Sequence, residues 1–304
     1  MKLNSILPIL LLLFPVLISA ADHPRLKDPV IFQRTETDRS GKPIIYGKLW
    51  VMEADGSNLR QISFGTTYDE HPSLYADQEH VLFGEFRANG YLPDKGARLV
   101  KLNIYTLERE VIAERINRAL HHATISPIDD LIAYHEDYGE RVSQWIDIGD
   151  AAREIPFRTT NGVRTKTGII AMHERNPSVS PREVSLIHVG TKDAITTATL
   201  LTDDRVMHRR PAISPDGKWL SWQTDANGTD DEIYLAEIDG SNSRNLTQTG
   251  GQDGHPWFSR DGKWIVFESD RSGNWEIWRM RTDGSAQDQL TEGKGQYVST
   301  RPRM

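Results

Sequence analysis

Residues 255–291 read HPWFSRDGKWIVFESDRSGNWEIWRMRTDGSAQDQLT, and residues 210–247, shortly before them, read RPAISPDGKWLSWQTDANGTDDEIYLAEIDGSNSRNLT. The two stretches share one plan: an Arg or His before proline, a Ser-x-Asp-Gly turn, an apolar run, an alternating run, an Asp-Gly turn and a final Leu-Thr. Short apolar or alternating runs between such turns predict β-strands, so each stretch holds four strands. A repeat of about 40 residues with four strands is typical of a β-propeller blade.

Further copies of this plan fill the rest of the chain. One copy begins at His71 and another at His122, and a third contains IIAMHE at 169–174, which parallels LIAYHE at 131–136. The strand patterns within residues 30–63 lack a first strand, whereas residues 297–303 resemble the start of a copy. We therefore predict an all-β, six-bladed β-propeller with four-stranded antiparallel blades, closed by the C-terminal strand joining the first blade.

The pattern HPxxSxDGxxIxFxSDRxGNxEIWxMxxDGxxxxxLT in residues 255–291 resembles the WD-like repeat (PD40) of the TolB-like β-propeller family. The resemblance extends over nearly all of residues 22–304 and implies a single propeller domain there. Proteins that resemble TolB include periplasmic scaffolds, sugar-acid lyases and the propeller halves of peptidases. The resemblance therefore implies the fold more narrowly than it implies an activity.

The first 21 residues have the pattern of a secretory signal peptide. They combine Lys2, an apolar stretch over residues 6–18, and the small residues Ser19 and Ala21 before a cleavage site. A retained membrane anchor is the alternative, which the short stretch disfavours. We therefore expect a periplasmic or secreted protein whose mature chain is one domain, residues 22–304.

Composition narrows the class of partner. The formal net charge of −7 argues against nucleic acid or an anionic membrane as the main partner. The chain has no cysteine, which excludes disulfides and lipid attachment through cysteine. We expect a monomer with no membrane span after signal removal, and a protein or oligosaccharide as its ligand.

Histidines and arginines are expected to gather at one end of the ring, which we call the channel mouth. In an up-and-down blade, the start of the first strand and the end of the second lie at the same end of the sheet. Residues at second-strand ends, His135 and His173, are candidates for binding a divalent metal, because imidazole suits zinc, manganese or nickel. A structural role for these polar residues stays open as the alternative. The residues expected to contact a ligand lie at first-strand starts: His71, His121, Arg209, Arg210, His255 and Arg301.

A second resemblance concerns catalysis. Residues 98–103 and 120–136 are similar to oligogalacturonate lyases, which are TolB-like propellers that remove a proton next to a uronate carboxylate. This resemblance implies that His122 is the catalytic base and that Arg98 stabilises the developing charge, with a divalent metal held by histidines. Residues 160–167 contain no histidine for the family's next metal ligand, and the chain has no Gly-x-Ser-x-Gly nucleophile elbow. The sequence favours a non-catalytic binding module, and the alternative is a metal-assisted polysaccharide lyase acting on uronate-containing oligosaccharides.

Overall fold

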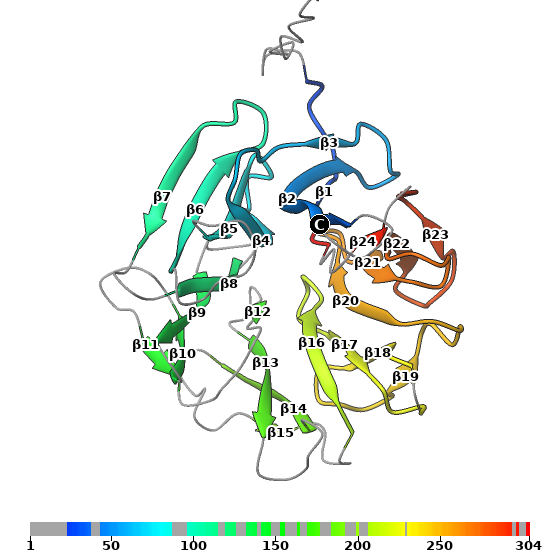
Figure 1. Cartoon of the computed structure of the whole chain (residues 1–304). Helices are drawn as coiled ribbons and strands as arrows, with labels where there is room; N and C mark the ends of the chain where they lie inside the picture. Colours follow the sequence, from blue (N-terminus) through cyan, green and yellow to red (C-terminus); the bar gives the residue numbers. More distant parts are fainter. Residues whose placement is uncertain are drawn as a thin grey trace, which may run out of the picture.

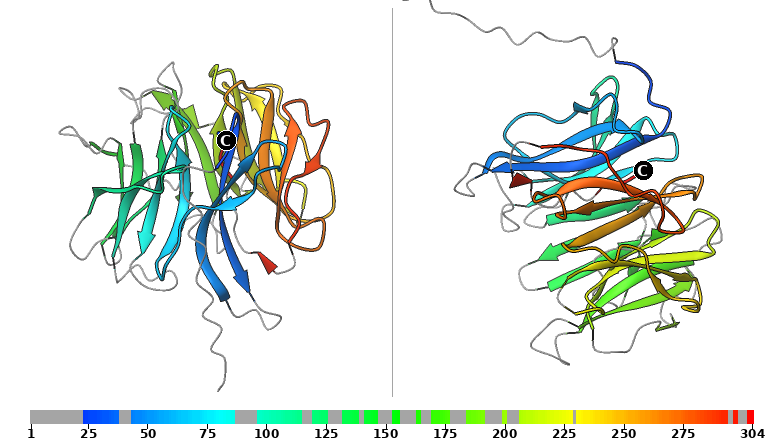
Figure 2. Two further views of the ribbon diagram at one scale, coloured as in Figure 1. Left: turned by 90° about the horizontal axis from the view of Figure 1, so that it is seen from above. Right: turned by 90° about the vertical axis from the view of Figure 1, so that its right-hand side faces the viewer.

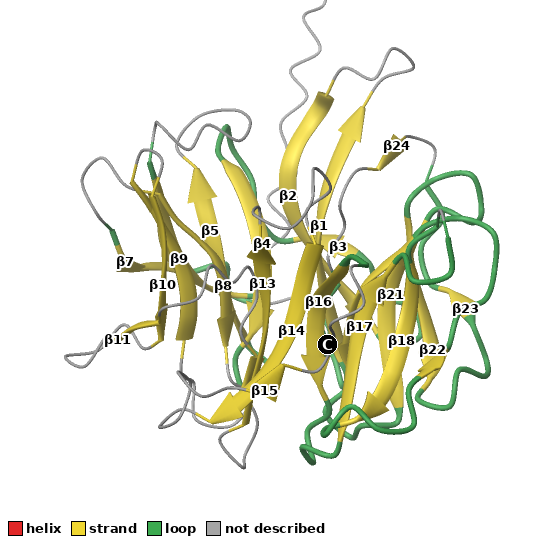
Figure 3. Cartoon of the chain, turned by 90° about the horizontal axis from the view of Figure 1, so that it is seen from below, coloured by secondary structure: helices red, strands yellow, loops and turns green. Residues whose placement is uncertain are grey.

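The structure is a computed structural model, and all regular secondary structure in its described residues is β-strand (Figure 3). It describes residues 23–37, 43–86, 96–114, 119–125, 132–138, 141–146, 153–155, 163–164, 169–176, 184–191, 199–200, 206–228, 230–293, 296–297 and 302–304. The signal peptide expected at residues 1–21 lies outside these ranges. Within them there is no apolar helix of membrane-spanning length.

Four blades are four-stranded sheets. The first contains β24 (Gln296–Tyr297), β1 (Pro29–Thr37), β2 (Pro43–Glu53) and β3 (Arg60–Gln61), in that order. The other three follow chain order: β12 (Val163–Arg164), β13 (Ile169–Asn176), β14 (Val184–Thr191) and β15 (Thr199–Leu200); β16 (His208–Ile213), β17 (Trp219–Thr224), β18 (Glu232–Glu237) and β19 (Arg244–Asn245); and β20 (Asp253–Phe258), β21 (Trp264–Ser269), β22 (Glu276–Arg281) and β23 (Asp288–Gln289).

The remaining strands form one eight-stranded sheet, so the prediction of six four-stranded blades is wrong. Within this sheet β6 and β8 pair in parallel at Ala97 and Ala119. A sequence repeat reports the strands inside each copy, but it does not report a pairing between strands of two copies. The strands of this sheet are β4 (Tyr68–Leu74), β5 (His80–Phe86), β6 (Ala97–Asn103), β7 (Arg109–Ala113), β8 (Ala119–Ile125), β9 (Ile132–Tyr138), β10 (Arg141–Ile146) and β11 (Arg153–Ile155).

The sheets are arranged in a ring, with β4, β8, β12, β16 and β20 nearest its centre (Figure 1). The side views show the sheets packed face to face around this ring (Figure 2). We call the strands nearest the centre the inner strands. Residues on adjacent inner strands therefore come together even where they are far apart in sequence.

The C-terminal residues join the first sheet, as the sequence predicted. β24 pairs antiparallel with β1, with Tyr297 opposite Glu36. Farther along β1, Ile31 and Arg303 exchange two backbone hydrogen bonds of 2.8 Å. The first sheet is thus built from both ends of the chain, which pairs an edge of β1 that would otherwise be exposed.

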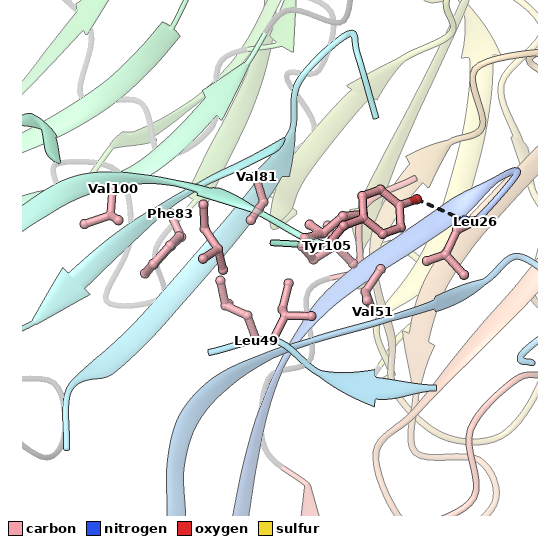
Figure 4. Close-up of a cluster of buried hydrophobic side chains, with 11 residues drawn as sticks. Leu26, Leu49, Val51, Val81, Phe83, Val100 and Tyr105 are labelled. Carbon is pink, nitrogen blue, oxygen red and sulfur yellow. Dashed lines mark hydrogen bonds between the residues drawn. The ribbon is translucent and has the colours of Figure 1, made fainter. Parts of the chain in front are cut away.

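Apolar side chains fill the spaces between sheets. Val51 on β2 and Phe83 on β5 belong to a cluster that joins the first sheet to its neighbour, and Tyr105 accepts a hydrogen bond of 2.9 Å from the Leu26 backbone (Figure 4). Trp278 packs against a second cluster, and Trp222 is buried in a third. Burial of each such side chain stabilises the fold by about 1.5–3 kcal/mol.

Candidate functional site

Four of the predicted ligand-binding or catalytic residues occupy the same position in four inner strands. His71, His122, Arg210 and His255 have φ angles of 50°, 51°, 57° and 50°. Each lies where the pairing of its strand with the next strand shifts register. These are β-bulges, in which an extra residue adopts a left-handed conformation that residues other than glycine rarely adopt. The sequence placed these residues before the first strand of each blade, whereas the structure places them inside it.

We call these four residues the bulge residues. Two of them, His71 and His255, each bind a buried glutamine from the preceding sheet. The His71 backbone N–H donates to Oε1 of Gln33 on β1 at 3.3 Å, and the His255 N–H donates to Oε1 of Gln223 on β17 at 3.4 Å. These glutamines were not among the site residues predicted from the sequence. The signal was present, because VIFQ at 30–33 aligns with LSWQ at 220–223.

His71 and His122 come together although they are far apart in sequence. Their ring centroids lie 3.7 Å apart and the rings are tilted by 48°. Glu70 joins them, with Oε1 at 3.1 Å from Nδ1 of His71, and the Glu70 and His71 side chains are each only 3% exposed. His122 is half-buried. Glu70 directly precedes His71 in the sequence but was not among the residues predicted to contact a ligand or a metal.

This trio has the donor atoms of a metal site. Each of Glu70, His71 and His122 offers one ligand atom, and these atoms lie within 4.8 Å of one another. Among the residues that the structure describes, no other group of three or more His, Cys, Asp or Glu side chains has this property.

His255 has a similar partner in a different geometry. Its Nδ1 contacts Oε1 of Glu268, which lies on the adjoining strand β21 rather than next to it in sequence. Both side chains are buried. The same bulge position thus supports a His–Glu pair in two sheets.

Two arginines lie at the bulge of β16. Nη2 of Arg209 donates to Oδ2 of Asp231 at 2.7 Å, and Nε2 of Gln223 donates to the same oxygen, also at 2.7 Å. The Arg209 side chain is 26% exposed, and Arg210 is half-buried. Arg209 and Arg210 are thus more accessible to a ligand than His71 or His255.

Arg98 lies on β6 in a three-residue ion cluster. Its Nη2 donates to Oε1 of Glu85 at 2.8 Å, and Arg109 binds the other oxygen of that carboxylate. Glu85 is buried, whereas the two arginines are partly exposed. Arg98 was predicted to stabilise charge during catalysis, but in the structure its guanidinium is already paired with the Glu85 carboxylate.

Three other predicted residues can be placed by their backbone. His121 on β8 lies directly opposite His135 on β9, and His173 on β13 lies opposite Ile187 on β14. The side chains of His121, His135 and His173 are not among those described, and Arg301 lies outside the described residues.

Buried carboxylates accompany two of the bulges. Asp69 and Asp253 each stand two residues before a bulge histidine, and burial raises the pKa of both. The Lys48 ammonium, 3.3 Å from Asp69, opposes this shift, as does the Arg271 guanidinium, 2.8 Å from Asp253. The first pair joins two sheets, from β2 to β4, whereas the second lies within the sheet of β20 and β21.

A cavity of about 430 Å³ lies away from the bulges. It is lined by residues that include Ser259, Asp261 and Trp264, which belong to the turn after β20 and the start of β21. His255 lies toward the other end of β20. None of the predicted site residues lines this cavity.

Comparisons with known proteins agree with this architecture. Residues 183–303 match the PD40 family, the TolB β-propeller domain. Two similar solved structures are TolB from Acinetobacter baumannii, with 15% identity, a TM-score of 0.73 and coverage of 92% of this chain and 67% of the other, and a protein of Agrobacterium tumefaciens assigned as TolB, with 16% identity, a TM-score of 0.65 and coverage of 90% of both chains.

A third similar structure is an oligogalacturonate lyase in complex with manganese, with 16% identity and a TM-score of 0.53 over 88% of this chain and 74% of the other. A comparison with curated protein sequences gives no match. At these identities the solved structures show that this chain shares the TolB-like propeller fold. A fold by itself identifies neither a ligand nor an activity.

Proposed function

We propose that this protein is an exported binding module that takes an anionic protein segment or oligosaccharide at the inner strands near the bulges. The observation that supports this proposal is the repeated placement of His or Arg at an equivalent left-handed bulge in four inner strands. Unfavourable backbone conformations that recur at one place are typical of functional sites. Guanidinium groups bind carboxylates through paired hydrogen bonds, so the ligand carries carboxylates.

Among the predicted site residues whose side chains are described near the bulges, His122, Arg209 and Arg210 are partly exposed, whereas His71 and His255 are buried. Binding should therefore depend on these three residues, among which Arg210 is the arginine at the bulge itself. The test is isothermal titration of the purified protein with an oligogalacturonate and with a Glu-rich peptide, each compared with a neutral analogue. Arg210→Glu should weaken binding at least tenfold, because it places a negative charge against the ligand.

Arg244→Glu is the matched control, since Arg244 is exposed on β19 at the outer edge of the same sheet. It reverses the same charge away from the inner strands and should leave binding unchanged. Equal loss in both variants would mean that net charge, rather than this surface, governs binding. Absence of binding to both acidic ligands by the unmodified protein would refute the proposed ligand class.

Export is the second part of the proposal, and the signal pattern of residues 1–21 supports it. Expression of the full chain followed by cell fractionation should find the protein in the periplasm or the medium. N-terminal sequencing should give Asp22 as the first residue. An unprocessed chain in the cytoplasm would contradict export without affecting the ligand proposal.

A metal-assisted lyase is the second candidate function, favoured by the closeness of His122 to His71 and Glu70. In this reaction a base removes the proton next to the uronate carboxylate, the glycosidic oxygen leaves, and a double bond forms in the sugar. His122 is the candidate base, and it can act as one only while its own imidazole is not a metal ligand. The test is the absorbance of the unsaturated product from oligogalacturonate with added Mn²⁺. His122→Ala should abolish it and His255→Ala should not; no absorbance from the unmodified protein would exclude this activity.

A further inference from the structure

The bulges of β4 and β8 bring two imidazoles and a carboxylate to one point. The ring centroids of His71 and His122 lie 3.7 Å apart, and Oε1 of Glu70 lies 3.1 Å from Nδ1 of His71. We propose that Glu70, His71 and His122 bind a divalent cation of the zinc, manganese or nickel class. This site differs from the pair His135 and His173 that the sequence suggested for a metal.

The fold holds these donors close to the required spacing. Donor atoms that share one ion at about 2.1 Å lie about 3–3.5 Å from each other. The three donor atoms here lie within 4.8 Å of one another, so a small side-chain rotation would close the site. The hydrogen bond from the His71 N–H to Gln33 fixes the backbone of one bulge, and the pairing of β8 with β9 fixes the other. Little conformational freedom is therefore lost when an ion binds.

The donor set selects the class of ion. Calcium and magnesium prefer oxygen ligands, whereas imidazole nitrogen suits zinc, manganese and nickel. Glu70 and His71 are almost completely buried, so water competes weakly for their ligand atoms. One carboxylate against a divalent ion leaves a net positive charge at the site.

Three protein ligands leave at least one coordination position open, as in sites where a metal binds a substrate. The half-buried side of the site is that of His122. We infer that a carboxylate of the anionic ligand occupies this position. This last step rests on the proposed function, whereas binding of the ion itself does not.

The experiment uses the full mature chain, freed of metal with a chelator and titrated with Zn²⁺ and Mn²⁺ in a calorimeter without any acidic ligand. One ion should bind per chain. His122→Ala and Glu70→Gln should each weaken binding at least about a hundredfold, more than the loss of a group that only supports a ligand. His255→Ala is the matched control, because His255 occupies the same bulge position beside a buried carboxylate. It should leave metal affinity unchanged.

A spectroscopic readout separates a direct ligand from a structural residue. Co²⁺ bound to the unmodified protein and to His255→Ala should give the same visible absorption, and His122→Ala should lose it. Circular dichroism checks that each variant is folded, and Glu70→Gln keeps the size of the buried side chain. Failure of the unmodified protein to bind any of these ions would overturn the proposal. So would folded His122→Ala and Glu70→Gln variants that bind metal as tightly as the unmodified protein.

The two proposals fail differently. Oligogalacturonate binding that persists in excess chelator, together with no metal binding, would refute the metal site and keep the binding module. A protein that binds the metal ion but binds neither acidic ligand would refute the binding module and keep the metal site. Metal-dependent binding of oligogalacturonate, lost in His122→Ala, would support both.

Discussion

Oε1 of Gln223 on β17 accepts a hydrogen bond of 3.4 Å from the backbone N–H of His255 on β20. The neighbouring Gly254 leaves the space that this side chain needs, because a Cβ at Gly254 would lie 2.8 Å from the same oxygen. The glutamine thus couples one sheet to the bulge of the next. Gln33 and His71 repeat the relationship.

Gln223→Ala should destabilise the protein by about 1–3 kcal/mol, because it leaves a buried N–H at His255 and part of Asp231 without their hydrogen bonds. Urea unfolding followed by tryptophan fluorescence measures this change. Gln289→Ala is the control, since Gln289 is exposed and should change stability by less than about 0.5 kcal/mol. Equal effects would mean that the bulge does not depend on this contact.

Gly56→Ala should be more destabilising than Gly273→Ala. Both glycines have left-handed φ angles, +86° and +95°. Alanine adopts such angles at a cost of about 1–2 kcal/mol. A Cβ at Gly56 would also lie 2.8 Å from the Leu290 carbonyl oxygen, whereas nothing lies within 4 Å of one at Gly273. Thermal unfolding of both variants measures the difference in stability. The contact of Gly56 in the first sheet with Leu290 in the last sheet is the expected cause of this difference. Identical melting temperatures would contradict this packing.

Removing both arginines around Glu85 should destabilise more than removing the carboxylate. Arg98→Ala combined with Arg109→Ala leaves the buried Glu85 carboxylate without its two arginine partners. The loss destabilises the folded protein by about 3–5 kcal/mol before solvent screening of the partly exposed arginines is taken into account. Glu85→Gln keeps a polar group of the same size, and the partly exposed arginines can turn to water. Chemical unfolding of both variants gives the order. The opposite order would show that Arg98 does not serve mainly to neutralise Glu85.

Asp253→Asn should change how stability depends on pH. Burial raises the pKa of Asp253, so the folded protein keeps a proton that the unfolded chain has already lost. This group therefore lowers stability as pH rises from its ordinary pKa, about 4, to its raised value in the folded protein. The stability of the unmodified protein minus that of Asp253→Asn should fall over this interval, as measured by urea unfolding at several pH values.

Asp283→Asn is the control of opposite sign. A hydrogen bond from Ser285 lowers the pKa of Asp283, so its stabilising effect is present above the ordinary pKa and is lost as pH falls. The stability of the unmodified protein minus that of this variant should rise with pH. A parallel response of the two variants would refute the assignment of burial as the cause at Asp253.

The turns of this protein could be predicted because they depend on neighbouring residues. The Asp-Gly-Ser sequences at 55–57, 239–241 and 283–285 each form a turn in which the Ser N–H donates to the Asp carboxylate at 2.9 Å. The glycine of each has a φ angle of +86°, +86° or +89°. The same local chemistry gives the same turn in three sheets.

The site could be predicted only in part. The positions of His71 and His122 in the repeat identified them as candidates, but their strands were expected to begin after them. The bulge adds a residue to one strand and not to its partner, and a repeat in sequence gives no sign of it. The glutamines were visible in the sequence, yet their hydrogen bonds lie between residues more than 30 positions apart.

The sequence by itself determined the β-strands, their turns and the joining of the C-terminal residues to the first sheet, because alternation, turn chemistry and repetition are properties of neighbouring residues. Tertiary structure decided that β6 pairs with β8 in one eight-stranded sheet, and that Glu70, His71 and His122 meet. These contacts depend on how one sheet lies against the next. That arrangement is set by the packing of the whole ring and not by the pattern within one repeat.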